Sequence, residues 1–270
     1  MSNVKLLYGR GELSVDLPET SDVTLIRKPR MPRLADPSLA VESTLSNPTA
    51  STILKNHAKN AKTACILICD ITRPVPNNLI LGPIIRKLMT LGIQSEQITI
   101  LIATGLHRPN EGKELEELIG DPWVLENTKV ENHFARDDSA HIEVGTTKKG
   151  NRILLDRRFV SADVRIVTGL VEPHFMAGYS GGRKVIAPGV AHAETITTFH
   201  SSRYMEDPLA TNCNLDGNPL HEDQLEIVEM VGGALAMNVV IDEFRNLSFI
   251  NFGEIISSHL EAVGFIRKYA

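Results

Sequence analysis

Cysteine is scarce in this chain of 270 residues, which contains three: Cys65, Cys69 and Cys213. Their spacing forms neither a disulfide framework nor a zinc-ligand pattern. Cys65 and Cys69 lie in the apolar run ACILIC at residues 64–69, where a cysteine behaves as a small buried hydrophobe. We therefore expect these two cysteines to serve the core rather than a reactive site.

The chain also lacks long apolar runs and an excess of basic residues. No uncharged stretch reaches the roughly 18 residues of a membrane span, and the first residues contain no apolar signal core. The 28 lysines and arginines are outnumbered by 33 aspartates and glutamates, for a net charge of −5. A general nucleic-acid binder would have a basic surface instead. We expect a cytoplasmic protein that binds neither membrane nor nucleic acid, which leaves room for a local cationic pocket.

Apolar strands and amphipathic helices alternate from residue 63 onward. The continuously apolar run at residues 64–69 is typical of a central parallel strand that is covered on both faces. We predict further strands at residues 98–103, 152–155 and 164–170, and helices at residues 77–91, 110–119 and 222–231. This alternation predicts an α/β fold, a three-layer and mostly parallel Rossmann-like sheet with flanking helices. Ligands of such sheets bind beyond the carboxyl ends of the strands.

The two ends of the chain add smaller elements. A β-hairpin is predicted over residues 4–16, a helix within residues 38–58, and a closing hairpin from strands at residues 235–241 and 247–252. Residues 253–270 have a helical pattern with no glycine or proline stop after it. We take residues 1–253 as one α/β domain and residues 254–270 as a helix that links it to a continuation of the natural chain.

Polar side chains follow three of the predicted strands directly. The first group lies in DITRPVP at residues 70–76, where two prolines stiffen the turn and hold Asp70, Thr72 and Arg73 in place. Arg73 could bind a carboxylate with two parallel hydrogen bonds. A salt bridge between Asp70 and Arg73 within the turn is an equally acceptable interpretation.

The other two strand ends each contribute a histidine. His107 follows the strand at residues 98–103, and His174 follows the strand at residues 164–170. A histidine in such a position suits general acid–base catalysis, although a single histidine is more often structural. Two of them at the same edge of one sheet could approach a substrate from opposite sides.

A glycine-rich segment, AGYSGGRK at residues 177–184, follows His174. Its flexible backbone could approach an anion, and Arg183 and Lys184 add positive charge beside it. The segment matches neither the P-loop nor the dinucleotide fingerprint. Lys184 could be an electrostatic anchor or a point of covalent attachment.

The remaining histidines give weaker signals. His200 is a candidate metal ligand, although it has no cysteine partner and no HExxH pattern. His192 and His221 are weaker candidates, and His221 is expected to be structural at the start of a helix. No function is predicted from the sequence around four others: His57, His133, His141 and His259.

These motifs, taken in order, resemble those of the nickel-pincer lactate racemases and their relatives. The matching segments are DITRPVP at residues 70–76, TGLHRP at 104–109, EPH at 172–174, GYSGGRK at 178–184, His200, and GNPLHE at 217–222. The resemblance covers nearly the whole chain. It implies an N-terminal α/β domain that binds the cofactor and carries catalytic residues, followed through a linker helix by a second, C-terminal α/β domain that is absent here.

The resemblance also implies a cofactor and a role for each motif. The cofactor is nickel(II) held by a pyridinium-3,5-bisthiocarboxylate mononucleotide, attached covalently to Lys184 and with His200 as a nickel ligand. His107 and His174 are implied as the two acid/base residues. The turn residues implied to contact cofactor and substrate are Asp70, Ile71, Thr72 and Arg73, with Arg73 on the substrate carboxylate.

The implied activity is racemisation or epimerisation of a 2-hydroxy acid through hydride transfer to the pyridinium ring. The implied partners are this small-molecule substrate and the proteins that synthesise the cofactor. Ile71 stands where histidine is common among lactate racemases, so a larger 2-hydroxy acid is as acceptable as lactate. Two other functions are kept open: a protein that binds the nickel-pincer nucleotide without turnover, and a metal-dependent hydrolase that uses His174 and His200.

Overall fold

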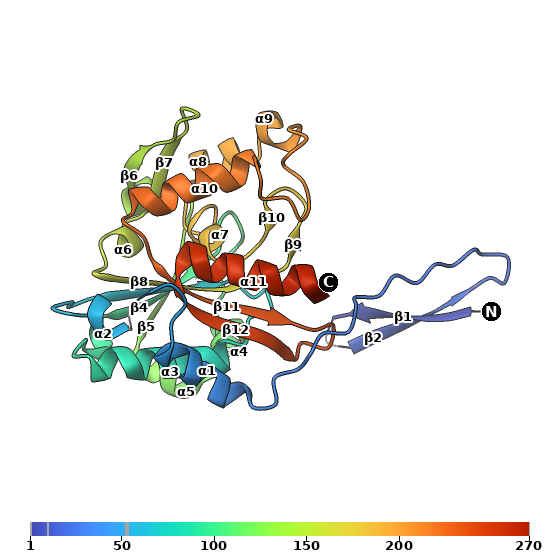
Figure 1. Cartoon of the computed structure of the whole chain (residues 1–270), viewed down its shortest axis with the longest axis horizontal. Helices are drawn as coiled ribbons and strands as arrows, with labels where there is room; N and C mark the ends of the chain where they lie inside the picture. Colours follow the sequence, from blue (N-terminus) through green and yellow to red (C-terminus); the bar gives the residue numbers. More distant parts are fainter. Residues whose placement is uncertain (1, 10, 52–53, 270) are drawn as a thin grey trace.

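A six-stranded sheet runs through the middle of the molecule, and Figure 1 shows it edge-on between two layers of helices. The computed structural model describes residues 2–9, 11–51 and 54–269. The strand order is β12-β11-β8-β3-β4-β5, and every neighbouring pair is parallel except β11 with β12. The strands are β3 (Ala64–Cys69), β4 (Ile98–Ala103), β5 (Lys129–Asn132), β8 (Val164–Leu170), β11 (Leu235–Ile241) and β12 (Leu247–Glu254). The predicted mostly parallel α/β fold is thereby confirmed.

Helices cover both faces of this sheet (Figure 1). One face is covered by α1 (Pro37–Ser46), α3 (Asn77–Thr90), α4 (Gly112–Ile119) and α5 (Pro122–Asn127). The other is covered by α7 (Arg183–Ile186), α8 (Ala193–Phe199), α10 (Pro219–Met230) and α11 (Ile255–Tyr269). Strand β3 explains why two cores form, because its side chains alternate: Ile66 packs into one core, and Cys65 and Leu67 pack into the other. Such a strand must be apolar on both faces.

Small elements complete the chain. They are the hairpin strands β1 (Ser2–Tyr8) and β2 (Gly11–Leu17), β6 (His141–Thr146) and β7 (Arg152–Asp156), β9 (Pro173–His174) and β10 (Gly178–Tyr179). Short helices are α2 (Leu54–His57), α6 (Arg157–Val160) and α9 (Ser202–Met205), with 3-10 turns at Ser95–Gln97 and Asp138–Ala140. The β1–β2 hairpin, predicted over residues 4–16, projects from the body of the molecule (Figure 1). Within the predicted segments, residues 10, 52–53 and 270 lie outside the described residues.

Several predicted elements need correction. The strand predicted at residues 152–155 exists as β7, but it pairs with β6 in a separate hairpin and not with the central sheet. The edge strand β5 was not predicted, because its sequence KVEN has no apolar run. The last helix begins at Ile255 instead of residue 253, because β12 continues to Glu254, whose carboxylate accepts hydrogen bonds from the Ile256 and Ser257 amides.

Helix α11 belongs to the same folded body as the sheet. Its residues Ala262, Val263 and Ile266 are buried in a small core with Val171 and Val240. That this helix leads to a second α/β domain stays a prediction. Among the described residues, no helix is long and apolar enough to cross a membrane.

We predict that replacing Ile66 by alanine lowers the free energy of unfolding by about 2–5 kcal/mol, since the fully buried side chain leaves a cavity in the middle strand. Ile26, which is 93% exposed, provides the matched control, and its alanine variant should change stability by less than about 0.5 kcal/mol. Urea unfolding followed by circular dichroism measures both. Equal effects of the two substitutions would contradict the packing described above.

Candidate active site

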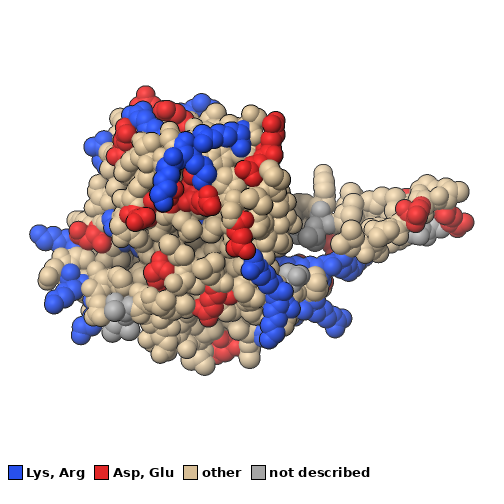
Figure 2. All heavy atoms as spheres, turned by 45° about the horizontal axis from the view of Figure 1, so that its top comes forward, with Lys and Arg blue, Asp and Glu red and all other residues tan. Residues whose placement is uncertain are grey.

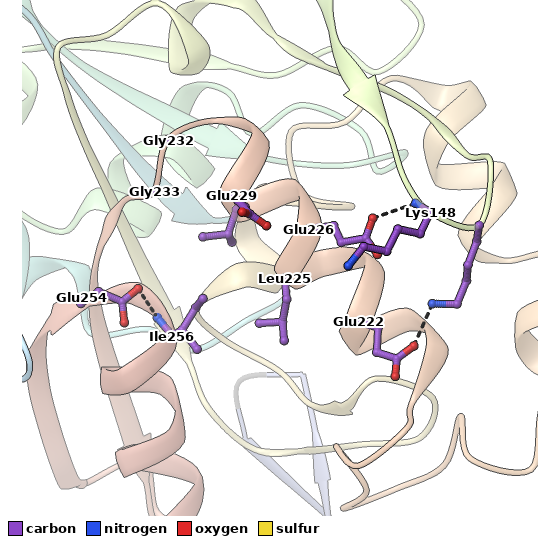
Figure 3. A pocket seen from close by; sticks show the side chains of 11 residues that line it. Lys148, Glu222, Leu225, Glu226, Glu229, Gly232, Gly233, Glu254 and Ile256 are labelled. Atoms are coloured by element: carbon purple, nitrogen blue, oxygen red, sulfur yellow. Dashed lines mark hydrogen bonds and ion pairs between the residues drawn. The ribbon is translucent and has the colours of Figure 1, made fainter.

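Two hollows in the surface differ in chemistry. The larger, of about 890 Å³, lies beside α10 and is lined by lysines, glutamates and glycines (Figure 3). One ion pair lies in it, with Lys149 Nζ 2.9 Å from Glu222, and the backbone amide of Lys148 donates to Glu226 at 2.8 Å. No histidine or cysteine lines this hollow. Figure 2 likewise shows acidic and basic side chains interspersed, unlike the continuous basic surface of a nucleic-acid binder.

The smaller hollow, of about 430 Å³, lies beyond the carboxyl ends of β3, β4 and β8. We call it the edge cavity. The predicted site residues that line it are Asp70, Thr72, Arg73, His107, His174, Lys184 and His200. Three separate strand ends and two later segments therefore meet at one place, as expected for a parallel sheet. Ile71 is the exception, because it does not line the cavity and instead packs against the core between the sheet and α3.

Asp70 and His107 form a hydrogen-bonded pair across two strand ends. The Asp70 side chain is buried, its Oδ2 lies 2.6 Å from His107 Nδ1, and its Oδ1 accepts hydrogen bonds from the Thr72 amide and hydroxyl. A carboxylate oxygen accepts, so His107 Nδ1 donates and carries the proton. In the neutral ring, Nε2 of His107 then holds a free lone pair, the atom that a general base requires.

His174 is held in the opposite state. Its Nδ1 accepts hydrogen bonds from the backbone amides of Met176 and Ala177, at 3.3 and 3.1 Å, so the proton of the neutral ring is on Nε2. Burial, and then the positive charges of Lys184 and Arg73, lower the pKa of His174 to about 3. His174 is therefore neutral near pH 7 and presents an N–H group.

Arg73 pairs across the cavity mouth with Glu172, with 3.2 Å between Nη1 and Oε1. The alternative of a salt bridge between Asp70 and Arg73 is wrong, since Asp70 binds His107 instead. Glu172 belongs to the EPH segment, and the sequence alone assigned it no role. Both partners are part-exposed, so this pair contributes little to stability and leaves Arg73 available at the mouth.

Lys184 and Cys69 form part of the cavity wall. Burial, followed by the positive charge of Arg73, lowers the pKa of the half-buried Lys184 amine to about 8. Within the described residues the amine has no hydrogen-bond or ion-pair partner. Burial raises the pKa of the Cys69 thiol to about 11, so Cys69 stays protonated and serves as an apolar wall, in line with the sequence prediction.

His200 ends α8 and lines the cavity. Its Nδ1 lies 2.7 Å from the carbonyl oxygen of Ile196, so Nδ1 donates and Nε2 is unprotonated in the neutral ring. Histidine ligands of metals are oriented in the same way, by a hydrogen bond from the other ring nitrogen to a carbonyl or carboxylate. In the described part of the chain, however, no three His, Cys, Asp or Glu side chains are grouped so as to hold a metal ion. The hydrolase alternative therefore lacks its third protein ligand.

The glycine-rich segment packs closely against protein, and its residues Ser180, Gly181 and Lys184 also line the edge cavity. A Cβ at Gly178 would lie 2.1 Å from the Asn214 carbonyl oxygen, and one at Gly181 would lie 2.5 Å from Val171. Both residues also have positive φ angles, at 72° and 79°, which favour glycine. Arg183, which was predicted to add charge beside the site, is buried behind Lys184 and does not line the cavity.

The other histidines lie outside the edge cavity. His192 caps α8 by accepting from the Glu194 amide, and His221 lies at the start of α10, as its structural interpretation predicts. Sequence analysis missed Leu106, Phe175 and Ile196, which give the cavity an apolar lining. Leu106 and Phe175 could have been predicted as lining residues, because they are the immediate sequence neighbours of His107 and His174.

The fold and the edge cavity define a class of protein: a mostly parallel α/β protein whose site, lined by histidines and a lysine, lies beyond the carboxyl ends of the strands. Comparison with known families gives the assignment: the lactate racemase N-terminal domain matches residues 8–212. The chain therefore belongs to the lactate racemase N-terminal domain family.

Individual relatives agree with this assignment. The chain is 31% identical to a lactate racemase of Thermoanaerobacterium thermosaccharolyticum over all of its own length and 63% of that protein. It is 32% identical to one of Lactiplantibacillus plantarum over 84% of its length and 53% of that protein. The chain thus spans only about half to two thirds of these relatives.

Solved structures support the fold. The lactate racemase apoprotein of T. thermosaccharolyticum superposes with a TM-score of 0.86 at 30% identity, covering 100% of this chain and 63% of that one. A protein from Thermotoga maritima matches with a TM-score of 0.70 at 22% identity, over 86% of this chain and 58% of that one. At that identity the second likeness concerns the fold alone.

We predict that Lys184 reacts with an acylating reagent at lower pH than an ordinary lysine. Because its pKa is lowered to about 8, half of the amine is neutral near that pH, whereas an ordinary lysine reaches this point about two units higher. Peptide mass spectrometry after brief acylation at pH 6–10 measures the profile, with exposed Lys113 in the same sample as comparison. Identical profiles for the two lysines would contradict the buried environment of Lys184.

Proposed function

We propose that this chain is the cofactor-binding and proton-transferring part of a 2-hydroxy-acid racemase or epimerase that uses the nickel-pincer nucleotide. The observation that carries the proposal is the meeting of His107, His174, Lys184 and His200 in one edge cavity. The family assignment and the lactate racemases among its relatives support the same activity.

The residues present fit such a cofactor. The unpartnered amine of Lys184, with its pKa lowered to about 8, is a suitable point of covalent attachment. His200 offers an unprotonated Nε2 in the same cavity, which suits nickel coordination. Among the described residues no group of three metal-ligating side chains is present, so the nucleotide would have to supply further donors beside His200. When bound, the cofactor supplies an electron-poor ring that can accept hydride from the substrate carbon.

The chain's own residues then handle the hydroxyl proton. His107 accepts it at Nε2, and Asp70 stabilises the resulting imidazolium through Nδ1–H. His174 donates a hydrogen bond from Nε2 to the substrate oxygen on the other side. For His174 to transfer its Nε2 proton completely, Nδ1 must take up a proton. Nδ1 must then lose the hydrogen bonds that it accepts from the Met176 and Ala177 amides. Inversion of a carbon centre needs such a group on each side, which is why two histidines suit it.

Arg73 is proposed to bind the substrate carboxylate. Its Nη1 is held by Glu172, which orients the guanidinium at the cavity mouth and leaves other N–H groups for an incoming carboxylate. Asp70 and Thr72 complete this wall, while Ile71 faces the core and does not set substrate size. The substituent on the substrate carbon instead faces the apolar lining formed by Leu106 and Phe175. Cofactor-synthesis proteins are the implied partners, since the nucleotide must be delivered.

The first test is cofactor loading. We expect the protein, co-expressed with cofactor-synthesis proteins, to gain mass on the peptide that contains Lys184 and about one nickel per chain. The Lys184→Ala variant should lose the added mass, whereas Lys113→Ala, a change on the exposed surface, should keep it. Intact-mass spectrometry with metal analysis measures both. A folded protein that takes up neither nucleotide nor nickel would refute the cofactor assignment.

The second test separates catalysis from mere binding of the nucleotide. In loaded, intact protein we expect His107→Ala and His174→Ala to slow racemisation of a 2-hydroxy acid by about 10²-fold or more, with nickel retained. His57→Ala, at an exposed site outside the edge cavity, should be unaffected. Chiral chromatography of lactate and of larger 2-hydroxy acids gives the rates. Full activity of either cavity variant would falsify the two-histidine scheme, and no turnover by the unmodified loaded protein would favour the binding function.

A further inference from the structure

Arg183 is a buried cation without an anionic partner. It is the neighbour of Lys184 in α7, yet its exposure is 1% and it is among the largest fully buried side chains of the described residues. Among the described residues, no carboxylate lies within ion-pair distance of its guanidinium, and burial alone lowers its pKa, to about 9. Arg183 therefore keeps its charge at neutral pH although nothing neutralises it. Buried charges are costly, so such a group calls for an explanation.

Every donor of this guanidinium meets a neutral group. Nε donates to His221 Nδ1 at 2.6 Å, and Nη2 donates to the carbonyl oxygens of Ala177 and Tyr179 at 3.1 and 3.4 Å. Nη1 lies 2.8 Å from Nε2 and 3.4 Å from Nδ1 of His259. Because Nη1 approaches both ring nitrogens, it contacts the imidazole ring as a whole and does not form a hydrogen bond with one nitrogen alone.

The two histidines stay neutral because they are buried and also face this charge. Burial, and then Arg183, lower the pKa of His221 to about 3 and move that of His259 well below its usual value. His259 Nε2 lies 2.9 Å from the carbonyl oxygen of Ser180 and donates to it. His221 was expected to be structural and no role was predicted for His259, and the structure places both next to Arg183.

These contacts connect three elements to the wall of the edge cavity. His221 belongs to α10, His259 belongs to α11, and the carbonyls come from the segment between His174 and Lys184. Ala177 is the direct link, because its carbonyl accepts from Arg183 while its amide donates to His174 Nδ1. Ala177 thus makes both contacts: its amide helps to keep the His174 proton on Nε2, and its carbonyl is bound by the Arg183 guanidinium.

We propose that Arg183 is a positioning residue of the edge cavity: its guanidinium holds the Ala177 end of the His174 segment against α10 and α11, and its buried charge acts on the neighbouring Lys184. This inference rests on the proposed function in one respect, which is that His174 and Lys184 are functional residues. Its contacts are independent of nickel and of turnover.

Two substitutions separate position from charge. Arg183→Lys keeps the positive charge but cannot bind His221, His259 and two carbonyls at once. Arg183→Met removes the charge as well. Both are tested in the whole chain without cofactor, so a failure of the racemase proposal leaves the test intact.

The positional role is read from histidine side-chain ¹⁵N spectra, which distinguish protonated from unprotonated ring nitrogens. We expect His174 to have its proton on Nε2 in the unmodified chain and a mixture of both ring forms in Arg183→Lys, with the His174 signal assigned by its loss in His174→Gln. His107, held by Asp70, provides the internal control and should keep its proton on Nδ1. An unchanged His174 signal in Arg183→Lys would overturn the positional role.

The charge is read from the acylation of Lys184. We expect Arg183→Met to slow this reaction at least about twofold at pH 8, since a larger fraction of the amine is then protonated, and Arg183→Lys to slow it less. Equal rates in folded Arg183→Met and unmodified protein would overturn the electrostatic part. If Arg183→Met does not fold, the same comparison is made with Arg183→Gln, and Arg183→Lys still decides the positional role.

Discussion

The parallel pairing of β8, β3 and β4 is the constraint on which the site depends. Parallel hydrogen bonding aligns the carboxyl ends of neighbouring strands, so residues 37 to 99 positions apart in the sequence meet at one edge. Asp70 can therefore bind His107, and Arg73 can bind Glu172. The apolar strand interiors provide most of the core, whereas the polar residues directly after them bring the chemistry. One arrangement of the backbone thus serves both stability and the site.

Within that arrangement, neighbours decide what each histidine can do. A carboxylate next to Nδ1 of His107 leaves Nε2 free to accept a proton, whereas two backbone amides next to Nδ1 of His174 leave Nε2 as a donor. A carbonyl next to Nδ1 of His200 again leaves Nε2 unprotonated in the neutral ring. Three residues of one type thus adopt the two possible tautomers, because a neutral imidazole has a single proton to place.

Charge is divided in a similar way between Arg183 and Lys184. Consecutive residues of a helix point about 100° apart, so Lys184 faces the cavity while Arg183 points into the protein. The guanidinium offers five donors in a planar fork and can satisfy several neutral acceptors at once, which a lysine amine cannot do as well. The buried residue therefore orders the segment, and the amine remains unpartnered in the cavity.

Much of this was predictable from the sequence. The strands at residues 64–69, 98–103 and 164–170 were placed correctly because continuous apolar runs are a local property, and the resemblance to lactate racemases followed from motifs read in order. What only the tertiary structure decided were pairings between distant residues: Arg73 with Glu172 rather than Asp70, Ile71 facing the core, and Arg183 with His221 and His259. A sequence records which groups are present, but hydrogen-bond partners depend on the direction of each side chain, and that direction is fixed only when the layers pack.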